Sequence, residues 1–136
     1  MERRPRILLV DDDVRFVTIN KAVLQKHNFE VMAAASAEEG LALATQWRPD
    51  LIIMDVMLES HTEGFHATYE LRKNPALRNV PILMVTAINT PGYPWRFEPD
   101  DTWLPVDRLL DKPVEPDRLI EEVRRLLAQS GALPTS

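Results

Sequence analysis

Residues 6–13 read RILLVDDD, a short apolar run that ends abruptly in three aspartates. Residues 50–54 (DLIIM) and 81–85 (PILMV) are similar runs, and each also reaches a polar residue at its C-terminal end. Because their apolar residues are contiguous instead of alternating with polar ones, the runs are typical of strands buried on both faces of a parallel sheet. They predict the central strands of an α/β fold.

Helical patterns lie between the predicted strands. The side chains that recur at spacings of three and four residues after the first run are Phe16, Ile19, Val23 and His27. They predict an amphipathic helix with these residues on its buried face. Ser36 and Glu39 form a capping box, in which each residue satisfies an exposed backbone donor of the other, and the helix that they open should end near Trp47.

The remaining segments continue the alternation. Residues 29–33 predict the second strand, and residues 65–73 predict a helix that ends before a proline. The last helix should start after Pro116. Its expected features are an apolar face and a charged pair four residues apart: Leu119, Val123 and Leu126, and Glu121 with Arg125. Strands that alternate with helices imply a parallel sheet covered on both faces.

Residues 89–105 interrupt this alternation with four prolines, two tryptophans and a phenylalanine. So many prolines leave little room for a regular helix. We therefore predict a mostly irregular segment, in which the fourth helix of the alternation is short or replaced. Its aromatic side chains are expected to anchor the segment on the domain, and a partner-binding surface is the alternative.

The composition is that of one globular domain. At 136 residues, 45% of them hydrophobic, the chain can bury a core without disulfides or structural metals. We expect a single domain over residues 1–136, with a core of about residues 5–129 and a frayed tail at 130–136. The chain has no cysteine, which excludes disulfides, thiolate metal sites and cysteine nucleophiles.

The charge balance limits the partners. Sixteen basic and 21 acidic residues give a net charge of −5, which disfavours nonspecific attraction to nucleic acid or to an anionic membrane. The N-terminal apolar run is too short for a signal peptide or a membrane span. We expect a cytoplasmic protein that binds neither nucleic acid nor membrane directly, in which Arg3, Arg4 and Arg6 are solvated charges.

Polar residues follow the predicted strands at their carboxyl ends, where open parallel sheets bind ligands. They are Asp11, Asp12 and Asp13 after the first strand, Asp55 after the third, Thr86 at the fourth, and Lys112 after the last. Crowded carboxylates repel each other unless a cation neutralises them. Mg²⁺ suits this open edge because it takes one or two carboxylates, keeps several waters and accepts phosphate oxygens.

This set of side chains suits phosphoryl transfer, in which positioning and charge neutralisation do most of the catalysis. Asp55 is the natural nucleophile and would form an aspartyl phosphate, while Lys112 and Thr86 would contact the phosphoryl oxygens. Asp13 is more simply explained as the N-cap of the first helix. The histidines lack metal-ligand spacing with nearby acids and are read as surface residues: His27, His61 and His66.

Four motifs in order, ILLVDDD, DLIIMDVML, ILMVTA and LLDKPVEP, make the chain resemble the response-regulator receiver family over nearly its whole length. The resemblance implies a flavodoxin-like, doubly wound sheet of five parallel strands in the order 2-1-3-4-5. It also implies a cis bond between Lys112 and Pro113. The roles implied are Mg²⁺ ligands Asp11, Asp12, Asp55 and the backbone carbonyl of Met57, phosphoacceptor Asp55, switch hydroxyl Thr86 and phosphate-binding Lys112.

The chain departs from the family pattern at three places. Leu109 stands where receivers usually carry an aromatic switch residue, so the usual coupling between threonine and aromatic is in question. Glu59 stands where proline is common, and Gly64 falls one place late, which suggests a one-residue insertion. The proline-rich segment at 89–105 replaces a surface through which receivers commonly dimerise or meet partners.

Three functions are considered. The leading hypothesis is a phosphoacceptor switch served by a histidine kinase or a phosphotransfer protein, which is not an enzyme beyond its own phosphorylation and slow dephosphorylation. The second is a receiver-like interaction module that phosphorylation does not switch. The third is an aspartate-nucleophile phosphatase, which would need an additional general acid and a cap over the substrate.

Overall fold

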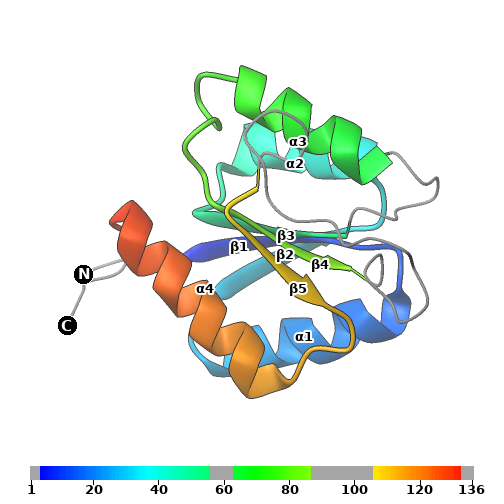
Figure 1. Cartoon of the computed structure of the whole chain (residues 1–136), viewed down its shortest axis with the longest axis vertical. Coiled ribbons are helices and arrows are strands. Elements are labelled where there is room, and N and C mark those ends of the chain that lie inside the picture. The colour runs from blue at the N-terminus through cyan, green and yellow to red at the C-terminus, as the bar shows by residue number, and fades with distance from the viewer. Residues whose placement is uncertain (1–3, 56–62, 87–105, 133–136) are drawn as a thin grey trace, which may run out of the picture.

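The computed structural model describes residues 4–55, 63–86 and 106–132. Five parallel strands form one sheet in the order β2-β1-β3-β4-β5 (Figure 1). The strands are β1 (Arg6–Val10), β2 (Glu30–Ala34), β3 (Leu51–Met54), β4 (Ile82–Thr86) and β5 (Arg108–Asp111). The α/β class and the predicted strand order are confirmed, and the predicted strand ends differ from the observed ones by about one residue.

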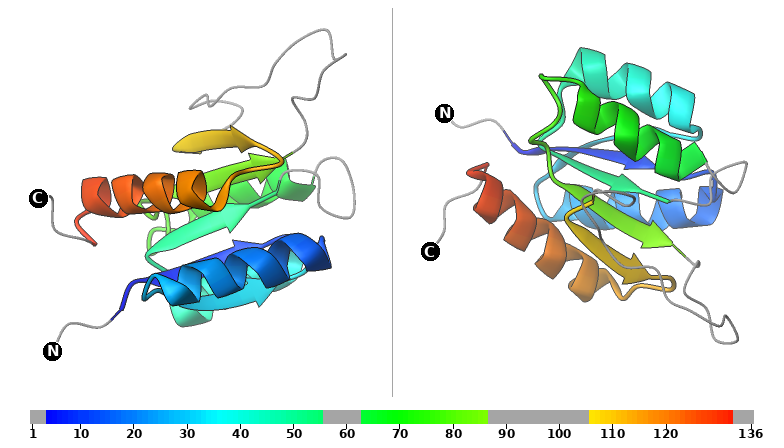
Figure 2. Two further views of the ribbon diagram at one scale, coloured as in Figure 1. Left: turned by 90° about the horizontal axis from the view of Figure 1, so that it is seen from below. Right: turned by 45° about the horizontal axis from the view of Figure 1, so that its top comes forward.

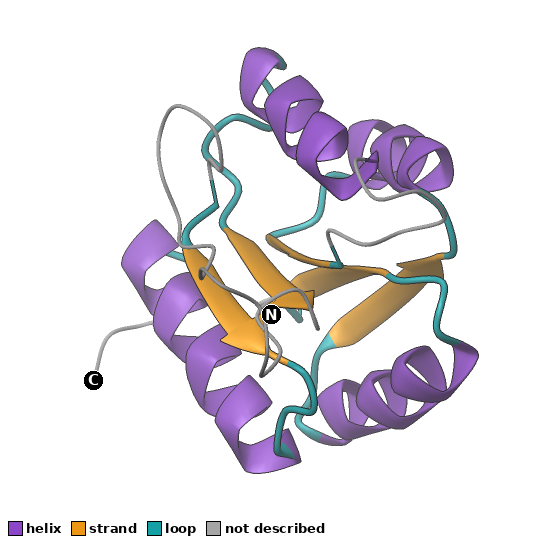
Figure 3. Ribbon diagram, turned by 45° about the vertical axis from the view of Figure 1, so that its right-hand side comes forward, coloured by secondary structure: helices purple, strands orange, loops and turns teal. Residues whose placement is uncertain are grey.

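Helices cover both faces of this sheet. They are α1 (Val14–Lys26), α2 (Ala37–Trp47), α3 (Glu63–Lys73) and α4 (Pro116–Ser130). Helices α2 and α3 lie on one face, and α1 and α4 lie on the other (Figures 1 and 2). The result is three layers, with the strands between two pairs of helices (Figure 3).

The core explains why the strand sequences do not alternate with polar residues. Successive residues of a strand point to opposite faces of the sheet, and here both faces are covered by helices. The strand residues packed toward α2 and α3 are Leu8, Val10, Ile52, Met54, Ile82 and Met84. Those packed toward α1 and α4 are Ile7, Leu9, Leu51, Ile53, Leu83 and Val85. Each of these side chains is at most 1% exposed.

The buried face of α1 differs from the predicted one. Asn20 and Leu24 are the buried residues of this helix, and Ile19 is 55% exposed, so the prediction that Ile19 faces the core is wrong. The row that faces the sheet is spaced by four residues and contains Phe16, Asn20 and Leu24. Ile19 precedes Asn20 by one residue. Because a helix has 3.6 residues per turn, this step places the Ile19 side chain to one side of the row.

Local capping follows the sequence closely. The Asp13 carboxylate accepts hydrogen bonds from the backbone N–H groups of Arg15 and Phe16, at 3.0 and 3.2 Å, which confirms it as the N-cap of α1. Ser36 caps α2 through the N–H of Glu39 at 3.2 Å. The Glu39 side chain accepts from the N–H of Ala35 instead of Ser36, so the expected capping box is only half formed.

Helix α4 ends at Ser130 and is followed by Gly131, whose φ of 87° lies in the left-handed region. Residues 133–136 of the expected tail and the whole proline-rich segment at 89–105 lie outside the described residues. In the described part of the chain, none of the helices combines the length and the apolar character that crossing a lipid bilayer requires.

Candidate functional site

The carboxyl ends of the strands bring the predicted site residues to one edge of the sheet. Val10 of β1 pairs with Met54 of β3, so the acids that follow these strands, Asp11 and Asp55, start from neighbouring positions. The Asp55 N–H donates to the Val10 carbonyl at 3.1 Å, and this bond continues the strand pairing into the site. Lys112 directly follows β5, which ends two strands away from β3.

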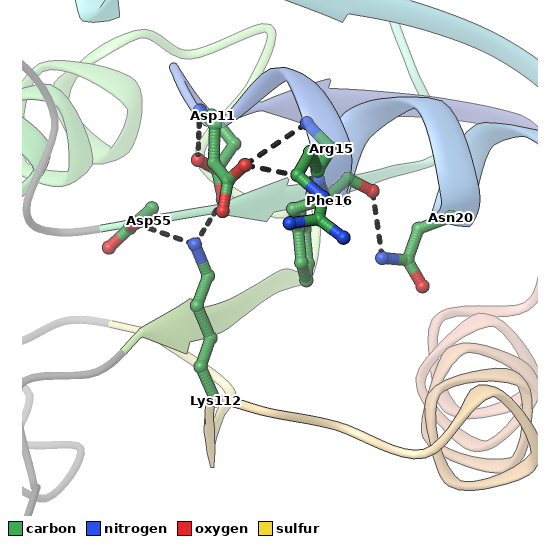
Figure 4. Close-up of polar contacts among 7 residues, drawn as sticks. Asp11, Arg15, Phe16, Asn20, Asp55 and Lys112 are labelled. Atoms are coloured by element: carbon green, nitrogen blue, oxygen red, sulfur yellow. Dashed lines mark hydrogen bonds and ion pairs between the residues drawn. The ribbon is translucent and has the colours of Figure 1, made fainter.

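Lys112 bridges the two carboxylates. Its Nζ atom lies 2.8 Å from Asp11 Oδ2 and donates to Asp55 Oδ2 at 3.1 Å (Figure 4). The side chains are 1% exposed at Asp11, 8% at Asp55 and 16% at Lys112. One ammonium is therefore shared by two carboxylates that are largely withdrawn from water, although the residues come from three different strand ends.

Burial and charge act against each other at this site. Burial raises the pKa of the Asp11 carboxyl, and the contact with Lys112 and the hydrogen bond from the Asp13 N–H only partly reverse this effect. Burial lowers the pKa of the Lys112 ammonium, but the carboxylates of Asp11 and Asp55 outweigh it and the net shift is upward. The lysine is thus held in its charged form.

The backbone fixes the acidic turn after β1. The Asp11 N–H donates to the Ala34 carbonyl at 3.0 Å, and Asp11 Oδ1 accepts from the Asp13 N–H at 2.9 Å. Asp12 follows with an exposed side chain and lines, with Asp11 and Glu39, a hollow of about 230 Å³. The Lys112-Pro113 bond is cis, as expected.

Met57 and Thr86 complete the set of predicted site residues. Met57 lies outside the described residues, as does Glu59 of the same loop. Thr86 is the last residue of β4 and its backbone pairs with Asp111, while its side chain falls outside the described part. Leu109, at the aromatic position of the family, is half-buried and packs against the apolar cluster beneath α2 and α3.

The Asp11 and Asp55 carboxylates supply oxygen ligands of the kind that a hard divalent ion binds, but not a complete set. Among residues 4–55, 63–86 and 106–132, no three acidic or histidine side chains are gathered closely enough to hold a metal by themselves. Two carboxylates, those of Asp11 and Asp55, do meet here, and both contact the Lys112 ammonium. Asp11 Oδ2 is buried, and its neighbour in the described part of the site is the Lys112 ammonium at 2.8 Å. Mg²⁺ needs only one or two carboxylates beside water and phosphate oxygens.

Phe16 also lies at this site, although its helical spacing predicted only a place in the core. Its ring centroid lies 4.5 Å from Lys112 Nζ, a distance typical of a cation–π contact. The position of Phe16 in the sequence did indicate a place near the site. It lies in the first turn of α1, three residues after Asp13, and this turn adjoins the acidic residues. Helical spacing alone did not distinguish this position from an ordinary core residue.

Comparison with known proteins gives a consistent result. Residues 7–124 match the family model of the response regulator receiver domain. The chain is 32% identical over 130 residues to the DNA-binding dual master transcriptional regulator RpaA of Synechocystis sp., covering 96% of this chain and 52% of RpaA. It is also 32% identical over 126 residues to Protein PilH of Pseudomonas aeruginosa, covering 90% of this chain and 98% of PilH. The chain thus spans about half the length of RpaA and nearly all of PilH.

Solved structures resemble the fold closely. A CheY-like response regulator receiver domain protein from Methanospirillum hungatei JF-1 has a TM-score of 0.79 at 26% identity, covering 95% of this chain and 98% of its own. The receiver domain of a sensor histidine kinase from Pseudomonas aeruginosa PAO1 has a TM-score of 0.78 at 27% identity, covering 92% and 98%. The latter was solved with a magnesium ion coordinated in its active-site cleft.

Proposed function

The chain belongs to the response regulator receiver domain family, and on this premise we propose that it is a phosphoacceptor switch phosphorylated on Asp55. The donor would be a histidine kinase or a phosphotransfer protein in the cytoplasm. The observation that carries the proposal is the Lys112 ammonium, which lies 2.8 Å from Asp11 and 3.1 Å from Asp55 at the carboxyl edge of the sheet.

Asp55 is the proposed nucleophile. It is 6% exposed and sits directly after β3, where one carboxylate oxygen would form the new bond to phosphorus. The bond between phosphorus and the leaving atom of the donor would break, and the leaving group would depart with its electron pair. Lys112 would then contact the phosphoryl oxygens, and Thr86 would supply a hydroxyl at the end of β4.

Asp11, Asp12, Asp55 and the Met57 carbonyl would hold Mg²⁺ in this proposal. When bound, the ion would neutralise the negative charge of the phosphoryl oxygens and of the nearby carboxylates. The gathering of the Asp11 and Asp55 carboxylates around one point at the sheet edge and the magnesium ion coordinated in a related receiver domain support this assignment.

Acetyl phosphate tests the proposal directly. Incubation of the protein with acetyl phosphate and Mg²⁺ should add the mass of one phosphoryl group, and chelation of the metal should prevent the addition. Asp55→Asn should abolish it, because an amide is a poor nucleophile. Asp13→Asn is the matched control, since asparagine is an equally good N-cap. Equal phosphorylation of the Asp55→Asn protein would contradict the proposal.

Leu109 favours a second candidate, an interaction module that phosphorylation does not switch. Leu109 is half-buried and packs on the apolar cluster. It lacks the hydroxyl group with which a tyrosine at this position can occupy either a buried or a solvated position. The two functions are discriminated by the affinity for a partner protein that has been isolated by its binding to the unphosphorylated chain. The switch requires its affinity to change when Asp55 is phosphorylated, whereas the module requires the same affinity in both states.

A further inference from the structure

The Lys112 ammonium has a third neighbour besides its two carboxylates. The ring of Phe16 lies with its centroid 4.5 Å from Nζ, and Figure 4 shows the lysine side chain reaching up between Asp55 and this ring. We propose that Phe16 is a positioning residue for phosphoryl transfer, whose ring face holds the Lys112 ammonium at the edge of the sheet. The inference rests on the proposed phosphorylation of Asp55.

The ring is a fixed platform. Its side chain is half-buried and packs against the apolar cluster between the sheet, α1 and α4. The Phe16 N–H donates to Asp13 Oδ1 at 3.2 Å, and its carbonyl accepts from Asn20 Nδ2 at 2.8 Å. Asn20 is itself only 5% exposed. The backbone of Phe16 is therefore held from both sides, and the packing of the ring on the apolar cluster opposes its displacement.

Fixed positioning matters because the carboxylates have other tasks. Asp55 would lose an anionic oxygen when it is phosphorylated, and Asp11 would turn toward a divalent ion, so both would weaken their hold on the ammonium. The ring face attracts a cation through its quadrupole and offers no oxygen to a metal. It therefore attracts the lysine in every state of the site without competing for Mg²⁺.

A purely structural role for the ring makes a different prediction. If Phe16 only fills space, any side chain of the same shape should serve equally well, whatever the electron density of its face. If the ring holds the ammonium, withdrawal of electrons from the face should weaken the contact at constant shape. Fluorine substitution on the ring separates these two effects, because it lowers the negative potential of the face and changes the volume little.

The experiment replaces Phe16 by phenylalanines that carry increasing numbers of fluorine atoms. The rate of phosphorylation by acetyl phosphate, at saturating Mg²⁺, should fall stepwise with each fluorine, by about fivefold in total. Phe16→Leu should be slowed to a similar extent, and Phe16→Tyr should retain the rate of the unmodified protein. Ile19→Ala is the control, because Ile19 lines the same hollow as Phe16 and Lys112 but carries no ring.

A spectroscopic readout tests the geometry separately. The ring current of Phe16 should shift the proton signals of the Lys112 terminal methylene and ammonium upfield, and this shift should vanish in Phe16→Leu and persist in Phe16→Tyr. Unchanged rates across the fluorine series, or lysine signals without a ring-current shift, would overturn the inference. Absence of phosphorylation in the unmodified protein would instead overturn the proposed function, and the two failures are therefore distinguishable.

Discussion

Asp11 carries a charge in a place that disfavours it. It is 2% exposed, and burial raises the pKa of its carboxyl above the ordinary value of 3.8 even though Lys112 lies 2.8 Å away. Between 3.8 and the raised pKa, the folded protein keeps this proton while the unfolded chain has lost it. The free energy of unfolding therefore falls as the pH rises through this interval, and the loss is complete above the raised pKa.

Asp11→Asn should consequently stabilise the protein at neutral pH. An amide has the shape of the carboxyl without its charge, so the free energy of unfolding should increase by about 1 kcal/mol. Urea denaturation from about pH 3 to pH 7 checks this, and the gain should disappear at the acidic end, where both states carry the proton. Asp117→Asn, at an exposed position, is the control, and an equal gain there would show that the effect is not specific to the buried acid.

At the scale of elements, the contact between α2 and β1 depends on Gly40. A β-carbon at this position would lie 2.9 and 3.0 Å from the two methyl carbons of Val10, which is fully buried in the sheet. Valine has little rotamer freedom, so these methyl groups cannot move away easily. Glycine therefore permits the close approach of helix and strand just before Asp11, the first acid of the site.

Gly40→Ala should destabilise the protein although alanine favours helices. Overlap with Val10 should cost about 2 kcal/mol, and the better helix propensity should return about 1 kcal/mol. Ala42→Gly at an exposed position of the same helix measures this propensity term, which can then be subtracted. The measurement is the free energy of unfolding in urea. A stabilised Gly40→Ala protein would show that α2 can shift without cost.

A second link between elements was not foreseen from the sequence. Glu122 of α4 is 1% exposed and lies 3.4 Å from guanidinium nitrogens of Arg108, Arg118 and Arg125. The predicted pair of Glu121 with Arg125 also forms, at 3.3 Å. Helical spacing identified the pair on the exposed face, but only the packing of β5 against α4 brings Arg108 to the buried carboxylate.

At the scale of the whole molecule, the sequence predicted what depends on contiguous apolar runs and on local caps. RILLV and LIIM marked strands buried on both faces, and Asp13 was recognised as a cap from its position alone. The convergence of Asp11, Asp55 and Lys112 followed from the rule that parallel strands end at one edge. The rotation of α1, which exposes Ile19 and turns Phe16 toward Lys112, depends on side-chain packing and could not be predicted from spacing.

The charge balance of the site should also govern the stability of the whole fold. A ligand that binds only the folded state raises the free energy of unfolding, by about 2.7 kcal/mol at a hundredfold excess over its dissociation constant. Mg²⁺ should therefore raise the unfolding free energy of this protein, and a potassium salt at equal ionic strength should not. Asp12→Asn should weaken this effect, because it removes a proposed ligand of the ion.

Lys112→Ala gives the sharpest form of this prediction. Without the ammonium, Asp11 and Asp55 lose the cation that they share, so a divalent ion should be bound more tightly, on the order of tenfold. The Mg²⁺ concentration that gives half of the maximal stabilisation should fall accordingly, while phosphorylation of Asp55 becomes slower. Chemical denaturation at a series of Mg²⁺ concentrations measures this midpoint. If Lys112→Ala needs more Mg²⁺ than the unmodified protein, the ammonium helps to build the metal site instead of competing with the ion for its carboxylates.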